Sequence, residues 1–97
     1  MTEITYLPEV ECIITVENGL VDTQVVKVPD QDNKYQFLRV GKGIVVRENG
    51  KCYLPVGVVQ LDYRGERALV ELPQEADSGV RRLWVPFARF RPQKRTP

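Results

Sequence analysis

Histidine is absent from this 97-residue chain, and serine occurs only once, at Ser78. Because the usual serine and cysteine triads need an imidazole as general base, neither triad can be assembled from these residues. Thirteen carboxylates remain, but no spacing among them singles out an acid and base pair. The sequence therefore predicts that the protein is not an enzyme and has no catalytic residues.

Cysteine is scarce as well, because the chain has only Cys12 and Cys52, which are far apart in the sequence and belong to no CxxC motif. A structural zinc site needs four ligands, which two thiols cannot supply without histidine. We expect two reduced, buried thiols and no metal. Gly41-Lys42-Gly43 lacks the GxxxxGK spacing of a phosphate-binding loop, so it predicts a turn, and no cofactor is expected.

Long apolar runs are missing, and the first eleven residues already contain three glutamates instead of a basic start followed by an apolar stretch. This pattern predicts neither a secretory signal nor a membrane span. We therefore expect a cytoplasmic protein that makes no membrane contact. The composition, 42% hydrophobic and 28% charged, is typical of one globular domain.

Helical periodicity is absent over any useful window, whereas apolar and polar residues alternate, with Gly or Pro about every ten residues. Three turn motifs, Asn18-Gly19, Asn49-Gly50 and Arg64-Gly65, predict hairpins. The pattern predicts an all-β fold, a small single-domain barrel of seven or eight short, mostly antiparallel strands. We expect residues 1–8 to be a flexible N-terminus, residues 9–91 to form the barrel, and residues 92–97 to be a disordered basic tail.

Pairing outward from the three turns predicts the register of each hairpin. The expected cross-strand pairs are Cys12 with Val25, Val46 with Tyr53, Glu48 with Lys51, Asp62 with Arg67, Leu61 with Ala68, and Val59 with Val70. The first hairpin then directs Cys12 into the core. The third hairpin has one apolar face and a salt pair on the other, as a half-buried sheet requires.

Charge is distributed unevenly along the chain. Residues 1–33 hold seven acidic residues and one lysine, whereas residues 80–97 hold six basic residues and no acidic one, together with the only Trp and two of the three Phe. Cations interleaved with aromatic rings suit phosphate backbones, bases or an acidic protein. The candidate partner-binding residues are Arg82, Trp84, Arg89, Phe90, Arg91, Lys94 and Arg95. The alternative is that these arginines pair with the acidic first hairpin and that Trp84 is structural.

From Val56 onward the chain carries Gly57-Val58-Val59-Gln60-Leu61, the turn Arg64-Gly65, Ala68-Leu69-Val70-Glu71-Leu72, and Leu83-Trp84-Val85-Pro86 followed by Phe87-Ala88-Arg89-Phe90. Residues 56–91 thereby resemble the SH3-like small barrels. The resemblance implies a barrel, and one turn of 3₁₀ helix between the strand that ends in Pro86 and the final strand. Residues 1–55 lie outside it; we expect an additional N-terminal β-hairpin there, and residues 9–55 either complete the same barrel or form a separate layer. The strand beginning at Gly57 is also similar to KOW-type domains of ribosomal and transcription proteins, which implies RNA or protein contacts near the barrel loops. The aromatic ALYDY-like strand of peptide-binding SH3 domains does not occur, so recognition of proline-rich ligands is not predicted.

The sequence thus predicts a non-catalytic interaction or assembly module, such as an accessory subunit, which binds an acidic protein partner through its basic C-terminal surface. We expect a monomer or a weak homodimer. The alternative is an RNA- or DNA-binding module of the KOW-like kind, in which the same arginines contact phosphates. A net charge of only +1 and a pI near 7.7 weigh against this alternative.

Overall fold

The computed structural model describes residues 5–17 and 21–93, and in these residues the chain forms strands and two short 3₁₀ turns. The strands are β1 (Thr5–Glu17), β2 (Thr23–Pro29), β3 (Tyr35–Gly41), β4 (Val46–Glu48), β5 (Lys51–Pro55), β6 (Gly57–Asp62), β7 (Arg67–Glu71), β8 (Arg82–Pro86) and β9 (Phe90–Gln93). The 3₁₀ turns are η1 (Lys42–Ile44) and η2 (Phe87–Arg89). The predicted all-β class is confirmed.

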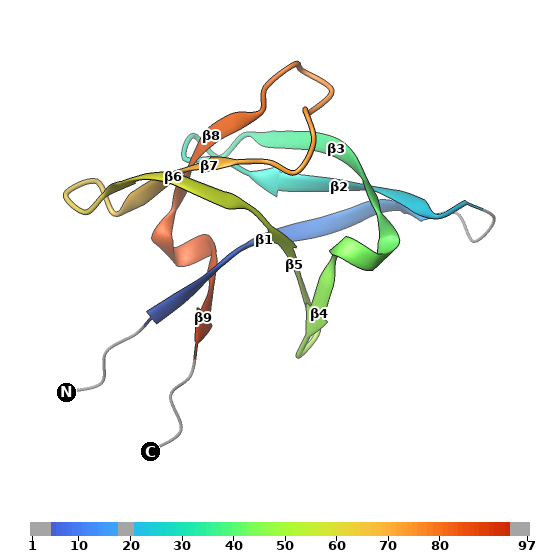
Figure 1. Cartoon of the computed structure of the whole chain (residues 1–97), viewed down its shortest axis with the longest axis horizontal. Coiled ribbons are helices and arrows are strands. Elements are labelled where there is room, and N and C mark those ends of the chain that lie inside the picture. The colour runs from blue at the N-terminus through green and yellow to red at the C-terminus, as the bar shows by residue number, and fades with distance from the viewer. Residues whose placement is uncertain (1–4, 18–20, 94–97) are drawn as a thin grey trace.

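Two antiparallel sheets make up the fold (Figure 1). The larger sheet has the order β3-β2-β1-β5-β4, with β9 also paired to β1, and the smaller sheet has the order β6-β7-β8. The long strand β1 is the organising element, because it pairs with β2, β5 and β9 along different parts of its length. The two sheets do not close into a barrel within the described residues.

The two hairpins whose turns lie in the described residues follow their local sequence closely. At Asn49-Gly50 both residues have positive φ, 51° and 79°, as a type I′ turn requires, and Glu48 pairs with Lys51 as predicted. In the β6–β7 hairpin the pairs nearest the turn are also confirmed. Farther from that turn, a bulge shifts the register so that Val58, not Val59, lies opposite Val70.

The predicted register of the first hairpin is wrong. Glu17 of β1 pairs with Gln24 of β2, so the connection is longer than a two-residue Asn-Gly turn, and a further irregularity lies between Ile14 and Val16. Cys12 does not face Val25 but lies opposite Cys52 of β5. Its predicted burial is confirmed, since Cys12 is 5% exposed. The proposed turn residues themselves lie outside the described part of the chain.

Both ends of the described chain belong to the larger sheet. Residues 5–8, predicted as part of a flexible N-terminus, are in strand β1, where Thr5 pairs with Gln93 of β9. The strand therefore starts before residue 9, and β9 continues past residue 91. The 3₁₀ turn that the resemblance implied after Pro86 is present as η2.

The core lies between the two sheets and consists of the inward-facing residues of both. Its fully buried members include Val10, Leu38 and Leu54 from the larger sheet and Val70 and Val85 from the smaller one. Alternation produces this arrangement, because residues two apart on a strand face the same side. No helix in the described residues has the length and apolarity needed to cross a membrane.

Candidate functional site

Arg82 and Trp84 both lie on β8 and contact residues of the neighbouring strand. Arg82 is opposite Glu71 of β7, and its Nε lies 3.5 Å from Glu71 Oε1. The Arg82 side chain is 57% exposed, so this is a surface ion pair. Trp84 is half-buried, and the Arg67 guanidinium lies 4.3 Å from the centroid of its ring. A protein group therefore already covers part of the indole face on which a base could stack.

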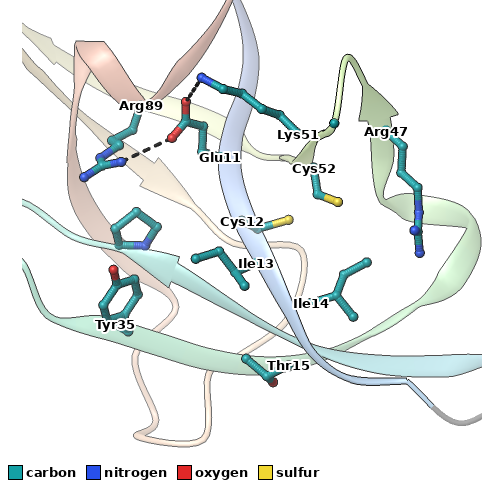
Figure 2. Close-up of a pocket in the computed structure, with 12 residues that line it drawn as sticks. Glu11, Cys12, Ile13, Ile14, Thr15, Tyr35, Arg47, Lys51, Cys52 and Arg89 are labelled. Atoms are coloured by element: carbon teal, nitrogen blue, oxygen red, sulfur yellow. Dashed lines mark hydrogen bonds and ion pairs between the residues drawn. The ribbon is translucent and has the colours of Figure 1, made fainter.

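Arg89, at the end of η2, pairs with an acidic residue from the first third of the chain. Its Nη1 lies 3.2 Å from Oε2 of Glu11, and Nζ of Lys51 lies 3.3 Å from the other carboxylate oxygen (Figure 2). Glu11 thus bridges two cations from different elements. The side chain of Arg89 remains 45% exposed at the rim of this cluster.

Among the described residues of the basic segment, Arg91 of β9 forms the most enclosed ion pairs. It donates to Glu9, with Nη1 3.1 Å from Oε1, and it also contacts Glu48. The Arg91 side chain is 22% exposed and that of Glu9 only 15%. Desolvation lowers the pKa of Arg91, but the hydrogen bond that Arg91 donates to Glu9 and the charge of Glu48 outweigh it, so the net pKa is raised.

The remaining candidate residues are Phe90, whose ring is buried, and the two basic residues Lys94 and Arg95 of the C-terminal tail. Phe90 is 5% exposed, belongs to the core cluster, and meets the ring of Tyr6 edge-on with centroids 6.4 Å apart. Lys94 and Arg95 lie outside the described residues. The structure therefore shows that Arg82, Arg89 and Arg91 form ion pairs with acidic residues of the same chain. The acidic partners of Arg89 and Arg91 lie on β1 and β4.

A different feature, not anticipated from the sequence, stands out on β6. Val58, Val59 and Leu61 are 46%, 43% and 47% exposed, and Tyr63 just beyond the strand is 75% exposed. The apolar face predicted for this hairpin does exist, because Val58 and Leu61 lie opposite the buried residues Val70 and Ala68. On β6, however, that face is uncovered, because the smaller sheet does not close against β1.

An open groove of about 420 Å³ lies beside this uncovered face. Its lining combines Val58, Leu61 and Tyr63 with Tyr6 and Phe87, and the other residues from Thr5 to Pro8 also contribute. The rings of Tyr6 and Tyr63 lie 6.2 and 6.0 Å from that of Phe87. Among the described residues, no charged side chain lines the groove.

The turn between β6 and β7 is held in place by Asp62. Its carboxylate accepts hydrogen bonds from the Gly65 N–H at 3.0 Å and from Arg67 Nε at 2.9 Å. These interactions hold the pKa of Asp62 below its ordinary value of 3.8, and the hydrogen bond from the Gly65 N–H has the largest effect. The predicted Asp62–Arg67 salt pair is confirmed. It holds in place the end of β6, where the neighbouring residue Tyr63 is exposed.

A second hollow, of about 530 Å³, lies beside β1 and contains both cysteines (Figure 2). Glu11, Arg47, Lys51 and Arg89 contribute charged groups to its lining. Among the residues that the structure describes, no three His, Cys, Asp or Glu side chains gather into a metal-binding cluster. Burial, followed by the charge of Cys52, raises the pKa of Cys12 to about 12.

Comparison with known proteins adds no identification. No family model matches the chain, and no curated protein or solved structure matches it either.

Proposed function

We propose that this protein is a non-catalytic binding module that takes up an extended, apolar segment of a partner protein along β6. The observation that carries the proposal is the combination of a free strand edge and an uncovered apolar face on the same six residues. Each alone is ordinary on a protein surface, but together they provide both the backbone and the side-chain contacts that strand addition uses.

The backbone of β6 supports strand addition because β7 pairs with only one of its edges. At the start of the strand, the N–H of Val56 donates to the carbonyl oxygen of Pro8, 3.0 Å away. Within the described residues no further strand pairs with that side of β6. An unpaired edge presents a row of N–H and C=O groups that only another extended chain can satisfy regularly.

The side chains define what kind of segment fits. In a strand paired to β6, alternate side chains would point into the groove between Leu61 and Phe87. Because the lining is uncharged, a charged side chain there would lose hydration without gaining a partner, so apolar side chains are selected. Completing the burial of a half-exposed Val or Leu contributes about 1 kcal/mol, roughly half the value for burying the whole side chain.

The ion pairs of the basic segment favour a protein over a nucleic acid as the partner. Phosphates approaching Arg89 or Arg91 would have to displace Glu11 or Glu9 and would meet the repulsion of these carboxylates. A role of Arg82, Arg89, Arg91, Lys94 and Arg95 in binding an acidic partner stays a prediction, as do the SH3-like barrel and the cytoplasmic location.

Selection of a displayed library of random linear peptides on the full chain tests the proposal. We expect selected peptides to alternate apolar residues, and to bind the variant Leu61→Lys at least about tenfold more weakly, equivalent to 1.4 kcal/mol. The matched control is Gln60→Lys, because Gln60 lies opposite Leu69 on the other face of β6 and should leave binding unchanged.

Three results would contradict the proposal. Equal binding to Leu61→Lys would place the peptide elsewhere on the molecule. Sedimentation that shows a dimer of the unmodified chain, dissociated by Leu61→Lys, would identify the added strand as a second copy. Tight, salt-sensitive binding of single-stranded RNA, lost in Arg89→Ala but kept in Leu61→Lys, would favour the nucleic-acid function instead.

A further inference from the structure

Cys12 and Cys52 are direct neighbours across two strands, although they are far apart in the sequence. The register of β1 and β5 places the two cysteines opposite one another. On each strand the cysteine is two residues from a member of the fully buried pair Val10 and Leu54, so both pairs face the same side of the sheet. Figure 2 shows the two side chains next to each other on their adjoining strands. Both are free thiols. From this arrangement we propose that Cys12 and Cys52 form an oxidisable dithiol site that closes reversibly to a disulfide between β1 and β5.

Strand geometry allows the bond. Residues directly opposite in an antiparallel pair have Cα atoms about 4.5 to 5.5 Å apart, which falls within the roughly 4.4 to 6.8 Å seen across disulfides. Their Cβ atoms are about 4.5 to 5.5 Å apart, at or beyond the upper end of the disulfide range of about 3.5 to 4.5 Å. Closing the bond therefore draws the two strands together. A disulfide that needs such a displacement is more easily reduced than a relaxed one, which makes the reaction reversible.

The two thiols differ in access, and the difference assigns their roles. Both cysteines line the open hollow of about 530 Å³, but Cys52 is half-buried whereas Cys12 is only 5% exposed. Cys52 is thus the thiol that an oxidant from solution meets first. Cys12 is the less accessible thiol and lies opposite Cys52, so it acts as the resolving thiol. Its raised pKa, caused by burial, makes the resolving step slow at neutral pH and faster as the pH rises.

With a low-molecular-weight disulfide such as oxidised glutathione as the oxidant, the reaction balances. The Cys52 thiolate attacks one sulfur of glutathione disulfide, a mixed disulfide forms, and the first glutathione leaves as a thiolate. Cys12 gives up its proton and attacks Sγ of Cys52, and the second glutathione leaves as a thiolate. The two protons released by the cysteines end on the two glutathione thiolates. Two protein thiols are oxidised, and one glutathione disulfide is reduced to two thiols.

The site is independent of the proposed strand-binding function, since its residues do not line the groove beside β6. The test uses the reduced, folded full chain incubated with oxidised glutathione, with the products followed by intact mass and by non-reducing peptide mapping. We expect the chain to lose two hydrogen atoms and to yield one peptide in which Cys12 is linked to Cys52. A low concentration of reduced glutathione should reverse the reaction.

Variants separate the two roles. Cys12→Ala removes the resolving thiol, so Cys52 should accumulate as a stable glutathione adduct, while Cys52→Ser should take up no glutathione in the folded state. In the unmodified chain, decay of the mixed disulfide should accelerate about tenfold per pH unit between pH 7 and 9, as the Cys12 thiolate fraction does. An adduct on the unmodified chain that persists at pH 9, disulfide-linked dimers, or adducts on Cys52→Ser without denaturant would each overturn the proposal.

Discussion

Raising the pH above 9 should destabilise the folded protein through the thiol of Cys12. Burial and, to a smaller extent, the charge of Cys52 raise the pKa of this thiol from 9.0 to about 12, although the charge of Arg47 opposes the rise. The folded chain therefore keeps the Cys12 proton at a pH where the unfolded chain has released it. The stabilising contribution of the neutral thiol is complete below pH 9 and is lost progressively between pH 9 and about 12.

The size of the loss follows from the two pKa values. One pKa unit corresponds to 1.36 kcal/mol, so a rise from 9.0 to about 12 allows a total loss of roughly 4 kcal/mol. Integrated between neutral pH and pH 10.5, the loss is about 2 kcal/mol. This is a large fraction of the free energy of unfolding of a domain of this size, about 5 to 15 kcal/mol.

Urea unfolding at pH 7.5 and at pH 10.5, in the presence of a reductant and followed by Trp84 fluorescence, measures the loss. The informative quantity is the loss in the unmodified chain minus the loss in Cys12→Ala, which lacks the thiol, because this difference removes every contribution that the two chains share. We expect this difference to be about 2 kcal/mol. Ile14→Val, a conservative change nearby on β1, is the control and should lose as much stability as the unmodified chain.

An equal loss in the unmodified chain and in Cys12→Ala would refute the reasoning. In that case the thiol would ionise as easily in the folded chain as in the unfolded one. The burial of the Cys12 side chain, opposite Cys52 of β5, would then not cause the desolvation that raises its pKa.

Two further predictions concern charge and backbone conformation. Arg91→Met should lower the urea midpoint more than Arg82→Met, because Arg91 is the more enclosed of the two arginines and its replacement removes ion pairs with two glutamates. Equal midpoints would show that the ion pairs of Arg91 are no stronger than surface pairs. Gly50→Ala should cost about 1 kcal/mol in the same assay, because φ at this position is +79°, whereas Gly43→Ala, with no atom within 4 Å of the added Cβ, should change stability by less than about 0.5 kcal/mol. A similar cost for both glycine variants would contradict the assigned turn.

The sequence predicted those parts of the fold that depend on neighbours along the chain. Asn49-Gly50 defines its hairpin because both strands are short and adjacent, so the turn alone sets their register. The same dipeptide at Asn18-Gly19 led to a wrong register, because β1 also pairs with β5 and β9 and tertiary contacts decide where Cys12 lies. The position of Cys12 opposite Cys52 could not be read from any local pattern.

For the candidate site, too, some features could be predicted from the sequence and others depend on contacts between distant parts of the chain. The pairing of C-terminal arginines with acids of the first strand was open as an alternative, because opposite charges at the two ends were visible in the sequence. The groove beside β6 was missed. One signal was available: Val58 and Val59 are adjacent, and alternation cannot direct both into one core without a bulge, which the structure contains between Val58 and Gln60.

The position of β1 at the centre of the larger sheet also has a consequence for how the chain is made. The partners of β1 come from residues 23–29, 51–55 and 90–93, so its pairing is complete only after nearly the whole described chain has been synthesised. At about 5 to 20 residues per second, several seconds pass during which β1 has left the ribosome without β9. During synthesis β1 can therefore pair with β2 and then with β5, and its pairing with β9 is the last step in the assembly of the larger sheet.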